Sequence, residues 1–417
     1  MKILFLTSSY AIGDFRGGGI TTYAAEVANL YRKSNDVSVI ICNEAQSTTE
    51  IPGIPTYHID PFSETYDCAV RLIEIIKKDN PEIIINSNVN LMSLVLPYIS
   101  DKIKVVSICH SLGSLETETS GLNHEYVDGI VALSRYAQTH IKNRFRLSSI
   151  KKIPVIPNFV ADYPNPETVI QQKVNSDITK IMFFGGGTGT KSPDLIAKVL
   201  KELLKTKLKF QFYWVGGTLP PFHRASLVKD VRQLVPFDDR VTFTGNLPHD
   251  EAQRLIADAN VFLLPSRREG CPMALLEAMR TGAIPIVADY NIANKEIVSS
   301  GINGFVISHR DVKKWVETLA EMIINKDRYH HMYWNSYNYF CDNLSYGVWQ
   351  NNMNKLLLIP TEHKDRDASI TPREFNSQCK RLHFLLKLRR LQNFFKETFP
   401  AYISMNAQYL TKHYTID

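Results

Sequence analysis

The 417-residue sequence predicts an α/β protein of two Rossmann-like domains that face each other across a cleft, followed by a C-terminal helical extension. Two observations carry this prediction. Short apolar runs alternate with helix-like segments in two successive series, and such runs are typical of parallel strands covered on both faces. The composition, 44% hydrophobic and 22% charged, is that of a globular protein with two domains and an appendage.

The first series of apolar runs predicts an N-terminal domain over residues 1–165. Its strands are expected at KILFLTS, VSVIIC, EIIINS, VVSICHS, GIVALS and VIPNFV, and its first helix at YAAEVANLYRK. The polar stretch from Asp162 to Ser176 contains Pro164 and Pro166. Proline-containing polar stretches between periodic segments are typical of loops, so this one is expected to connect the domains.

The second series predicts a C-terminal domain over residues 176–343. Its strands are expected at KIMFFGGG, KFQFYWVGG, RVTFTGN, VFLLPS, IPIVAD and GFVIS, and a helix follows at VKKWVETLAEMII. After residues 344–358, the chain no longer fits either sheet.

Residues 359–417 are expected to form a basic amphipathic helical tail. Residues 380–396 contain six Lys or Arg and no acid, and Phe384, Leu388, Leu391 and Phe395 fall at helical spacing. Such a helix suits the surface of an anionic membrane. It equally suits a terminal helix that packs on the body of the protein or on another subunit.

Charge and cysteine content exclude several classes of protein. The net charge of +6 suits an anionic ligand or a membrane surface, but it is too small to indicate a nucleic-acid partner. The apolar stretch after Lys2 is too short for a signal peptide, and nowhere do about 18 apolar residues run uninterrupted. The six cysteines form neither a C-x-x-C pair nor a zinc-ligand pattern. A cytoplasmic protein, free or peripheral on the inner face of the plasma membrane, is expected.

Two glycine clusters follow predicted strands, where ligands bind in parallel α/β sheets. Gly17, Gly18 and Gly19 precede a helix, so backbone amides there can approach a phosphate, although a surface loop fits the same residues. The second cluster, GGGTGTKS, resembles a phosphate-binding P-loop, but Thr190 stands before Lys191 where that motif requires glycine. The sequence therefore does not favour a nucleoside-triphosphate hydrolase, and a dinucleotide fingerprint is not convincingly present.

The most informative segment is VFLLPSRREGCPMALLEAM, residues 261–279. A buried strand is expected to end at Pro265, and a helix to open after Pro272 with its first amides facing the crevice. Glu269 stands in the loop, and Glu277 lies about one and a half turns into the helix. Carboxylates accept hydrogen bonds from vicinal hydroxyls such as those of a ribose or hexose, so this pair indicates a sugar-containing ligand.

These residues resemble the family 4 glycosyltransferases, retaining sugar transferases of the GT-B fold. The resemblance runs from residue 1 to about 358. It rests on the glycine turn, on VDGIVALSRYAQTHI and VIPNFV, on GAIPIVA and NGF, and on His110, Lys191 and the E-x7-E spacing of Glu269 and Glu277. The resemblance also implies that LSYGVWQNNMNKLLL forms a helix over residues 344–358 that crosses back to the N-terminal domain.

The resemblance implies a role for each motif. Glu277 would hold the ribose of a nucleotide, Glu269 would face the donor sugar, Lys191 would neutralise the diphosphate, and His110 would face the transferred sugar. This makes His110, Glu269 and Lys191 the candidate catalytic residues, although His110 also fits a hydrogen-bonded core position. The glycines at 17–19 would cap the phosphate or admit the acceptor. The implied donor site comprises Gly185, Gly186, Lys191, Ser266, Arg267, Arg268, Glu269, Met273, Ala274, Leu275 and Glu277.

The sequence departs from the family pattern at one position. The family usually has G-R-x-x-x-x-K where this chain has Gly185-Gly186 and Lys191. One cation that would contact the diphosphate is therefore missing. Arg267 or Arg268 is expected to supply this charge, or Thr188 and Thr190 to donate hydroxyls in its place.

The expected activity is transfer of a hexose-type sugar, with retention and without a metal, from a nucleotide-diphosphate sugar to an acceptor hydroxyl. No cofactor is expected. The only D-x-D is Asp365-Arg366-Asp367, in the polar tail. The acceptor is expected to be a glycan or a lipid-linked glycan in bacterial O-antigen, capsule or lipopolysaccharide synthesis. Two alternatives remain: a nucleotide-sugar isomerase or phosphorylase of the same fold, and a non-catalytic glycan-binding or scaffolding subunit.

Overall fold

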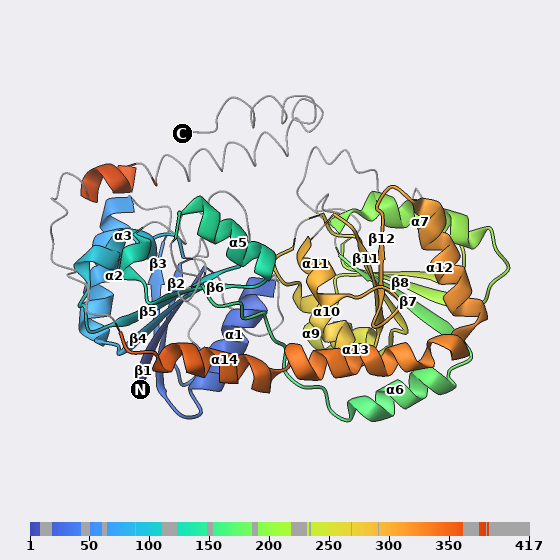
Figure 1. The fold of residues 1–417 in the computed structure, drawn as a ribbon, viewed down its shortest axis with the longest axis horizontal. Coiled ribbons are helices and arrows are strands. Elements are labelled where there is room, and N and C mark those ends of the chain that lie inside the picture. The colour runs from blue at the N-terminus through green and yellow to red at the C-terminus, as the bar shows by residue number, and fades with distance from the viewer. Residues whose placement is uncertain are drawn as a thin grey trace.

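Two parallel six-stranded sheets, each covered by helices, form the two halves of the molecule (Figure 1). This computed structural model describes residues 1–8, 19–42, 51–60, 65–87, 89–110, 123–147, 153–185, 191–217, 232, 235–267, 269–290, 292–361, 375–380 and 382. The fold class expected from the alternating apolar runs is confirmed.

The N-terminal sheet has the strand order β3-β2-β1-β4-β5-β6, with every pairing parallel. Its strands are β1 (Lys2–Thr7), β2 (Asp36–Cys42), β3 (Thr56–Ile59), β4 (Ile83–Ser87), β5 (Lys104–Cys109) and β6 (Gly129–Ala132). From Ile3 to Leu6 every side chain of β1 is buried, because β1 lies inside the sheet and helices cover both faces. A continuous apolar run is what such a position requires.

Two features of this sheet differ from the prediction. The run VIPNFV is not a strand, since only isolated bridges join Val155 to Ala132 and Val160 to Ser345. Pro157 interrupts the run and has no amide hydrogen for a strand ladder. The strand β3 was not predicted, because three of its four residues are only partly buried at the sheet edge and the segment lacks an apolar run.

The helices around the N-terminal sheet are α1 (Gly19–Tyr31), α2 (Thr65–Asp79), α3 (Met92–Val95) and α5 (Arg135–Arg144), with 3₁₀ turns at Leu96–Tyr98 and His124–Tyr126. Helix α5 begins after Ser134, whose hydroxyl accepts a hydrogen bond from the Ala137 amide at 3.1 Å. This capping bond fixes where α5 starts.

The C-terminal sheet has the strand order β12-β11-β10-β7-β8-β9, again wholly parallel. Its strands are β7 (Thr179–Phe184), β8 (Phe210–Val215), β9 (Val241–Gly245), β10 (Val261–Leu264), β11 (Ile284–Ala288) and β12 (Phe305–Ile307). All six coincide with predicted apolar runs. The order reverses between β7 and β10, and parallel α/β proteins bind ligands outside the carboxyl ends of the strands at such a point.

The helices of this half are α6 (Pro166–Asn175), α7 (Pro193–Leu204), α9 (His249–Asp258), α10 (Met273–Met279), α11 (Ile292–Ile297), α12 (Val312–Ile324) and α13 (His330–Asn343), with a 3₁₀ turn at Lys326–Tyr329. The stretch from Asp162 to Ser176, expected to connect the domains, contains α6. Pro166 stands in its first turn, where a missing amide hydrogen costs nothing, and Ile170 is buried in the C-terminal core.

Helix α14 (Tyr346–Leu358) returns the chain to the N-terminal half. It continues beyond α13 along the same side of the molecule (Figure 1). Trp349 of α14 is buried, and its ring lies 6.1 Å from that of Tyr23 and 6.0 Å from that of Tyr31, both on α1. One apolar cluster therefore includes side chains of both halves and of α14.

The predicted basic tail lies almost wholly outside the described residues, which include only 359–361, 375–380 and 382 of it. The D-x-D at Asp365 to Asp367 also lies outside them. Among the helices that the structure describes, none combines the length and the apolar character needed to cross a membrane.

Candidate functional site

The loops after β7 and β10 meet through an ion pair. Lys191 Nζ lies 2.6 Å from Glu269 Oε1, and the two side chains are 30% and 14% exposed. Lys191 directly precedes Ser192 and α7, whereas Glu269 lies in the loop that leads to α10. The structure thus places two predicted catalytic residues together at the point where the strand order of the sheet reverses.

The other described residues of this loop surround the start of α10. Ser266 is fully buried, and its hydroxyl has no hydrogen-bond partner among the described residues. Met273, Ala274 and Leu275 form the first turn of α10, and the Leu275 amide donates to the Pro272 carbonyl at 3.0 Å. The Leu275 amide is therefore already engaged within the protein, and Met273 and Ala274 are the better candidates for contacts with a ligand.

Gly185 closes β7 beside the ion pair. Its amide donates to the Val215 carbonyl at 3.0 Å, and a Cβ atom placed on it would lie 3.1 Å from Lys191 Cβ. A side chain at this position would push against Lys191. Its small size thus leaves room for the lysine that is predicted to neutralise the diphosphate.

Glu277 faces the N-terminal half from α10. It is buried, and desolvation raises the pKa of its carboxyl, while the nearby charge of Arg280 and a hydrogen bond with Gln253 act in the opposite direction. Glu26 of α1 lies across the interface. Burial, followed by repulsion from Glu277, raises the pKa of Glu26 to about 7. Two carboxyl groups from different halves thus share the positive charge of Arg280.

His110 follows β5 at the domain interface. Its ring is buried, Nε2 lies 2.9 Å from the Ser87 hydroxyl, and the Tyr23 ring packs edge-on at 4.9 Å between centroids. Burial lowers the pKa of His110 to about 4, so the imidazole is uncharged at neutral pH. Its backbone carbonyl packs against Gly270, where a Cβ atom would lie only 2.1 Å from the oxygen. The structure therefore brings His110 into contact with the loop that carries Glu269.

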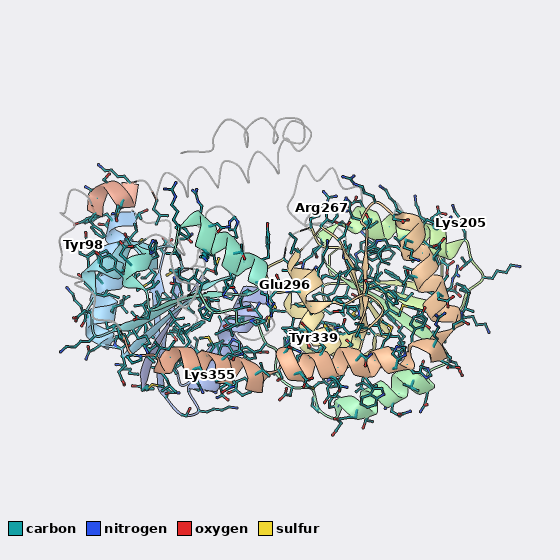
Figure 2. The ribbon with its side chains drawn as sticks, in the orientation of Figure 1. Tyr98, Lys205, Arg267, Glu296, Tyr339 and Lys355 are labelled. Carbon is teal, nitrogen blue, oxygen red and sulfur yellow. The ribbon has the colours of Figure 1, made fainter. Side chains whose placement is uncertain are left out.

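Two further contacts join the halves near this loop. The carboxylate of Glu296 on α11 accepts hydrogen bonds from the amides of Arg135 and Tyr136, at 2.7 and 2.8 Å, in the first turn of α5. Figure 2 shows Glu296 between the two halves. Asn158 Nδ2 donates to the Cys271 carbonyl at 2.8 Å. A negative charge at a helix N-terminus is favourable, so Glu296 helps to hold the halves in this orientation.

The guanidinium group of Arg267 contacts residues at the start of α7. Its Nε donates to Ser192 Oγ at 3.1 Å, and its Nη2 lies 3.7 Å from Asp194 Oδ2, so the guanidinium is turned toward the first turn of α7. The four other candidates Gly17, Gly18, Gly186 and Arg268 lie outside the described residues, as do Thr188 and Thr190. Gly19 is the first residue of α1.

Sequence reasoning did not identify Glu26 or Glu296. Both stand within ordinary helical segments, and their importance arises only because the two halves pack together. The raised pKa of Glu26 and the capping bonds of Glu296 are the signals that reveal them.

Two family profiles match this chain, one for each half. "Glycosyltransferase Family 4" matches residues 17–162, and "Glycosyl transferases group 1" matches residues 179–325. Together they cover more than half of the sequence. The chain belongs to the family 4 glycosyltransferases.

Alignments with similar sequences cover different fractions of this glycosyltransferase. The putative colanic acid biosynthesis glycosyltransferase WcaL of Salmonella typhimurium is 36% identical over 140 residues, 32% of this chain and 33% of that protein. Spore coat protein SA of Bacillus subtilis is 20% identical over 348 residues, 79% of this chain and 91% of that protein. The match with WcaL therefore extends over only about a third of each chain.

Solved structures share the fold of this glycosyltransferase. Anabaena Alr3699/HepE in complex with UDP-glucose superposes with a TM-score of 0.67 and 17% identity, over 86% of this chain and 100% of that one. The lipopolysaccharide outer core galactosyltransferase WaaB, in its apo form, gives a TM-score of 0.62 and 19% identity, over 86% and 99%. These likenesses establish the GT-B fold.

Proposed function

We propose that this glycosyltransferase moves a hexose-type sugar from a nucleotide diphosphate to an acceptor hydroxyl, with retention at the anomeric carbon and without a metal. The observation that carries the proposal is the 2.6 Å contact of Lys191 with Glu269, in the loops that follow β7 and β10. A cation and a carboxylate stand there side by side, where the family pattern puts the diphosphate and the donor sugar. The structure of HepE with UDP-glucose supports a nucleotide-sugar donor.

Cleavage of the bond between sugar and diphosphate builds negative charge on the leaving group. In the proposed reaction, Lys191 exchanges its contact with Glu269 for the diphosphate, and the amides of Met273 and Ala274 point toward the same charge. Fixed positive groups of this kind stabilise a leaving group without a metal ion. No metal or other cofactor is assigned to the reaction.

The remaining residues position the donor. Glu277, in the proposed arrangement, accepts hydrogen bonds from the two ribose hydroxyls. His110, being uncharged, offers the transferred sugar a neutral polar surface that does not repel the positive charge developing at the anomeric carbon. Glu269 is released when Lys191 turns to the diphosphate, and its carboxylate then faces the sugar hydroxyls.

The proposed pathway is the assembly of a bacterial cell-surface polysaccharide: O-antigen, capsule or lipopolysaccharide. The names of WcaL and WaaB, which refer to colanic acid and to the lipopolysaccharide outer core, support this assignment. The proposed acceptor is a glycan or lipid-linked glycan at the cytoplasmic face of the membrane. The basic pattern of residues 380–396 supports a peripheral contact with anionic lipid.

The donor is tested by thermal stabilisation with UDP-, GDP-, CDP- and ADP-linked sugars without added metal, since a ligand that binds only the folded state raises the melting temperature. We expect one nucleotide series to raise it, and Glu277→Gln and Lys191→Ala to abolish most of the shift. The exposed variant Lys205→Ala is the matched control. No shift with any donor would contradict the proposal and favour the non-catalytic scaffold.

The reaction course is tested on the product. Proton NMR should show the anomeric configuration of the donor in the first product formed, and chelation with EDTA should leave the rate unchanged. An inverted product would contradict retention, and loss of activity that added magnesium restores would contradict the metal-independent reaction.

A further inference from the structure

A recess lies beside the loops of the proposed donor site. It has a volume of about 440 Å³ and opens where β10, β11 and β12 end and where α7 and α12 begin. Lys191, Glu269 and Glu277 do not line it. Its wall includes Arg267, whose position at the edge of the C-terminal half is labelled in Figure 2. The pocket therefore lies outside the part of the proposed donor site that Lys191, Glu269 and Glu277 form, although Arg267, which the sequence assigned to that site, lines the pocket.

Positive charge dominates the lining. Among the described residues that form the pocket, Lys198, Arg267 and Arg310 are cationic, and Asp194 is the one carboxylate. Arg267 already lies near Asp194, at 3.7 Å between Nη2 and Oδ2. Lys198 and Arg310 are both exposed, so neither charge is buried in the protein interior.

The two guanidinium groups are fixed in place by an aromatic stack. The Tyr290 and His309 rings stack at 3.5 Å between centroids, and the guanidinium carbon of Arg267 lies 5.6 Å from the Tyr290 centroid. Arg310 Nε donates to His309 Nε2 at 3.2 Å, while His309 Nδ1 lies 2.7 Å from Asp289 Oδ1. Because Nε2 accepts this bond, the proton of the ring stands on Nδ1 and points at Asp289.

This arrangement leaves donors for a ligand. The bond from Arg310 uses only Nε, and its terminal nitrogens have no hydrogen-bond partner in the part of the chain that the structure describes. Guanidinium groups are planar forks that match the oxygens of a phosphate, and prior fixing of the side chains lowers the entropy lost on binding. Ser192 and Tyr290 belong to the same lining.

We propose that this pocket binds a soluble phosphate monoester of the size of a monosaccharide phosphate. The cationic side chains receive the phosphate, and the volume of the recess exceeds what the phosphate alone needs. Ser192 follows Lys191, and Arg267 precedes Glu269 by two residues, so the ligand contacts the same two loops that form the proposed donor site.

The test is isothermal titration calorimetry of the full chain with glucose 6-phosphate, and glucose, which lacks the phosphate, is the uncharged control ligand. We expect glucose 6-phosphate to bind and glucose not to bind. The double variant Lys198→Ala/Arg310→Ala should weaken binding by roughly tenfold or more, since each lost contact is a hydrogen bond to a charged group. Lys191→Ala should leave the affinity for glucose 6-phosphate unchanged.

A parallel titration with the nucleotide diphosphate that stabilises the protein should give the opposite pattern, weakened by Lys191→Ala and unchanged in the double variant. The proposed phosphate site would be wrong if the wild type and the double variant bound glucose 6-phosphate with equal affinity. It would also be wrong if Lys191→Ala lost this binding and the double variant kept it. Failure of nucleotide binding would instead contradict the proposed function. Both replaced side chains are exposed, and an unchanged melting temperature confirms that the double variant folds.

Discussion

Gly270 leaves no room for a side chain between the two halves. A Cβ atom there would lie 2.1 Å from the His110 carbonyl oxygen, so Gly270→Ala must displace either the loop or β5. We expect a loss of about 1–3 kcal/mol in stability, as for other overpacked sites, together with reduced transfer activity. Denaturant unfolding and initial rates measure the two effects.

The matched control is Gly347→Ala on α14, where no atom lies within 4 Å of the new Cβ. Alanine in a helix should leave stability unchanged or raise it by up to about 1 kcal/mol. Equal behaviour of the two variants would contradict the close contact between Gly270 and His110.

Glu26 makes the stability of the protein depend on pH. Burial and Glu277 raise its pKa from the ordinary 4.5 to about 7, so the folded state binds a proton that the unfolded state releases between these values. The free energy of unfolding should therefore fall as the pH rises through this window, by at most about 3 to 4 kcal/mol, since one pKa unit corresponds to about 1.4 kcal/mol.

Glu26→Gln should remove this fall, because the amide does not titrate. Unfolding at pH 4.5, 6 and 8 measures it, and Glu125→Gln, at an exposed position, is the control. If the pH profile of Glu26→Gln matched that of the control, the carboxyl of Glu26 would not be the titrating group.

A functional residue could be predicted where the neighbouring sequence identifies it, and not where its role depends on contacts with distant parts of the chain. Lys191, Glu269 and Glu277 could be identified because strand ends and motif spacing place them near one ligand, and the first two do meet. Glu26 could not, since its neighbours Glu277 and Arg280 come from another half of the chain. The direction of the Arg267 side chain was also beyond prediction, because it depends on Ser192 and Tyr290.

At the scale of elements, helix α5 depends on a cap from the other half. Glu296→Ala removes two hydrogen bonds, from the amides of Arg135 and Tyr136, and we expect a cost of about 0.5–2 kcal/mol, the usual range for a lost helix cap. Denaturant unfolding measures it. Glu317→Ala is the control, because its contact with Lys313 is exposed and worth about 0.5 kcal/mol or less. Equal losses in the two variants would contradict the capping role.

Strands differ in how clearly the sequence predicts them. Strands buried on both faces, such as β1 and β11, read as continuous apolar runs and could be predicted. The edge strand β3 is half-buried and has no such run. In the run at 155–160, Ile156, Phe159 and Val160 are buried in the core, yet Pro157 has no amide hydrogen for a strand ladder, so the run is buried without forming a strand.

At the scale of the whole molecule, Trp349 joins α14 to the N-terminal half. Its ring lies 4.3 Å from that of Phe159 and near those of Tyr23 and Tyr31. Trp349→Ala should cost about 3–5 kcal/mol, as for other buried aromatic residues. We expect calorimetry to show the loss in the unfolding of the N-terminal half, with Trp349→Phe recovering part of it. An unchanged thermogram would contradict the role of α14 as a structural part of both halves.

The bridge between Val160 and Ser345 brings the two interdomain crossings of the chain side by side. One crossing leads from Val160 to α6, and the other leads from α13 to α14. Two adjacent crossings are the arrangement of a hinge, so we expect the halves to rotate about the line that runs through both crossings. The contacts of Gly270 with His110 and of Glu296 with α5 must then open and close in the same rotation. In the proposed reaction, entry of the donor and departure of the spent nucleotide would therefore require one and the same rotation.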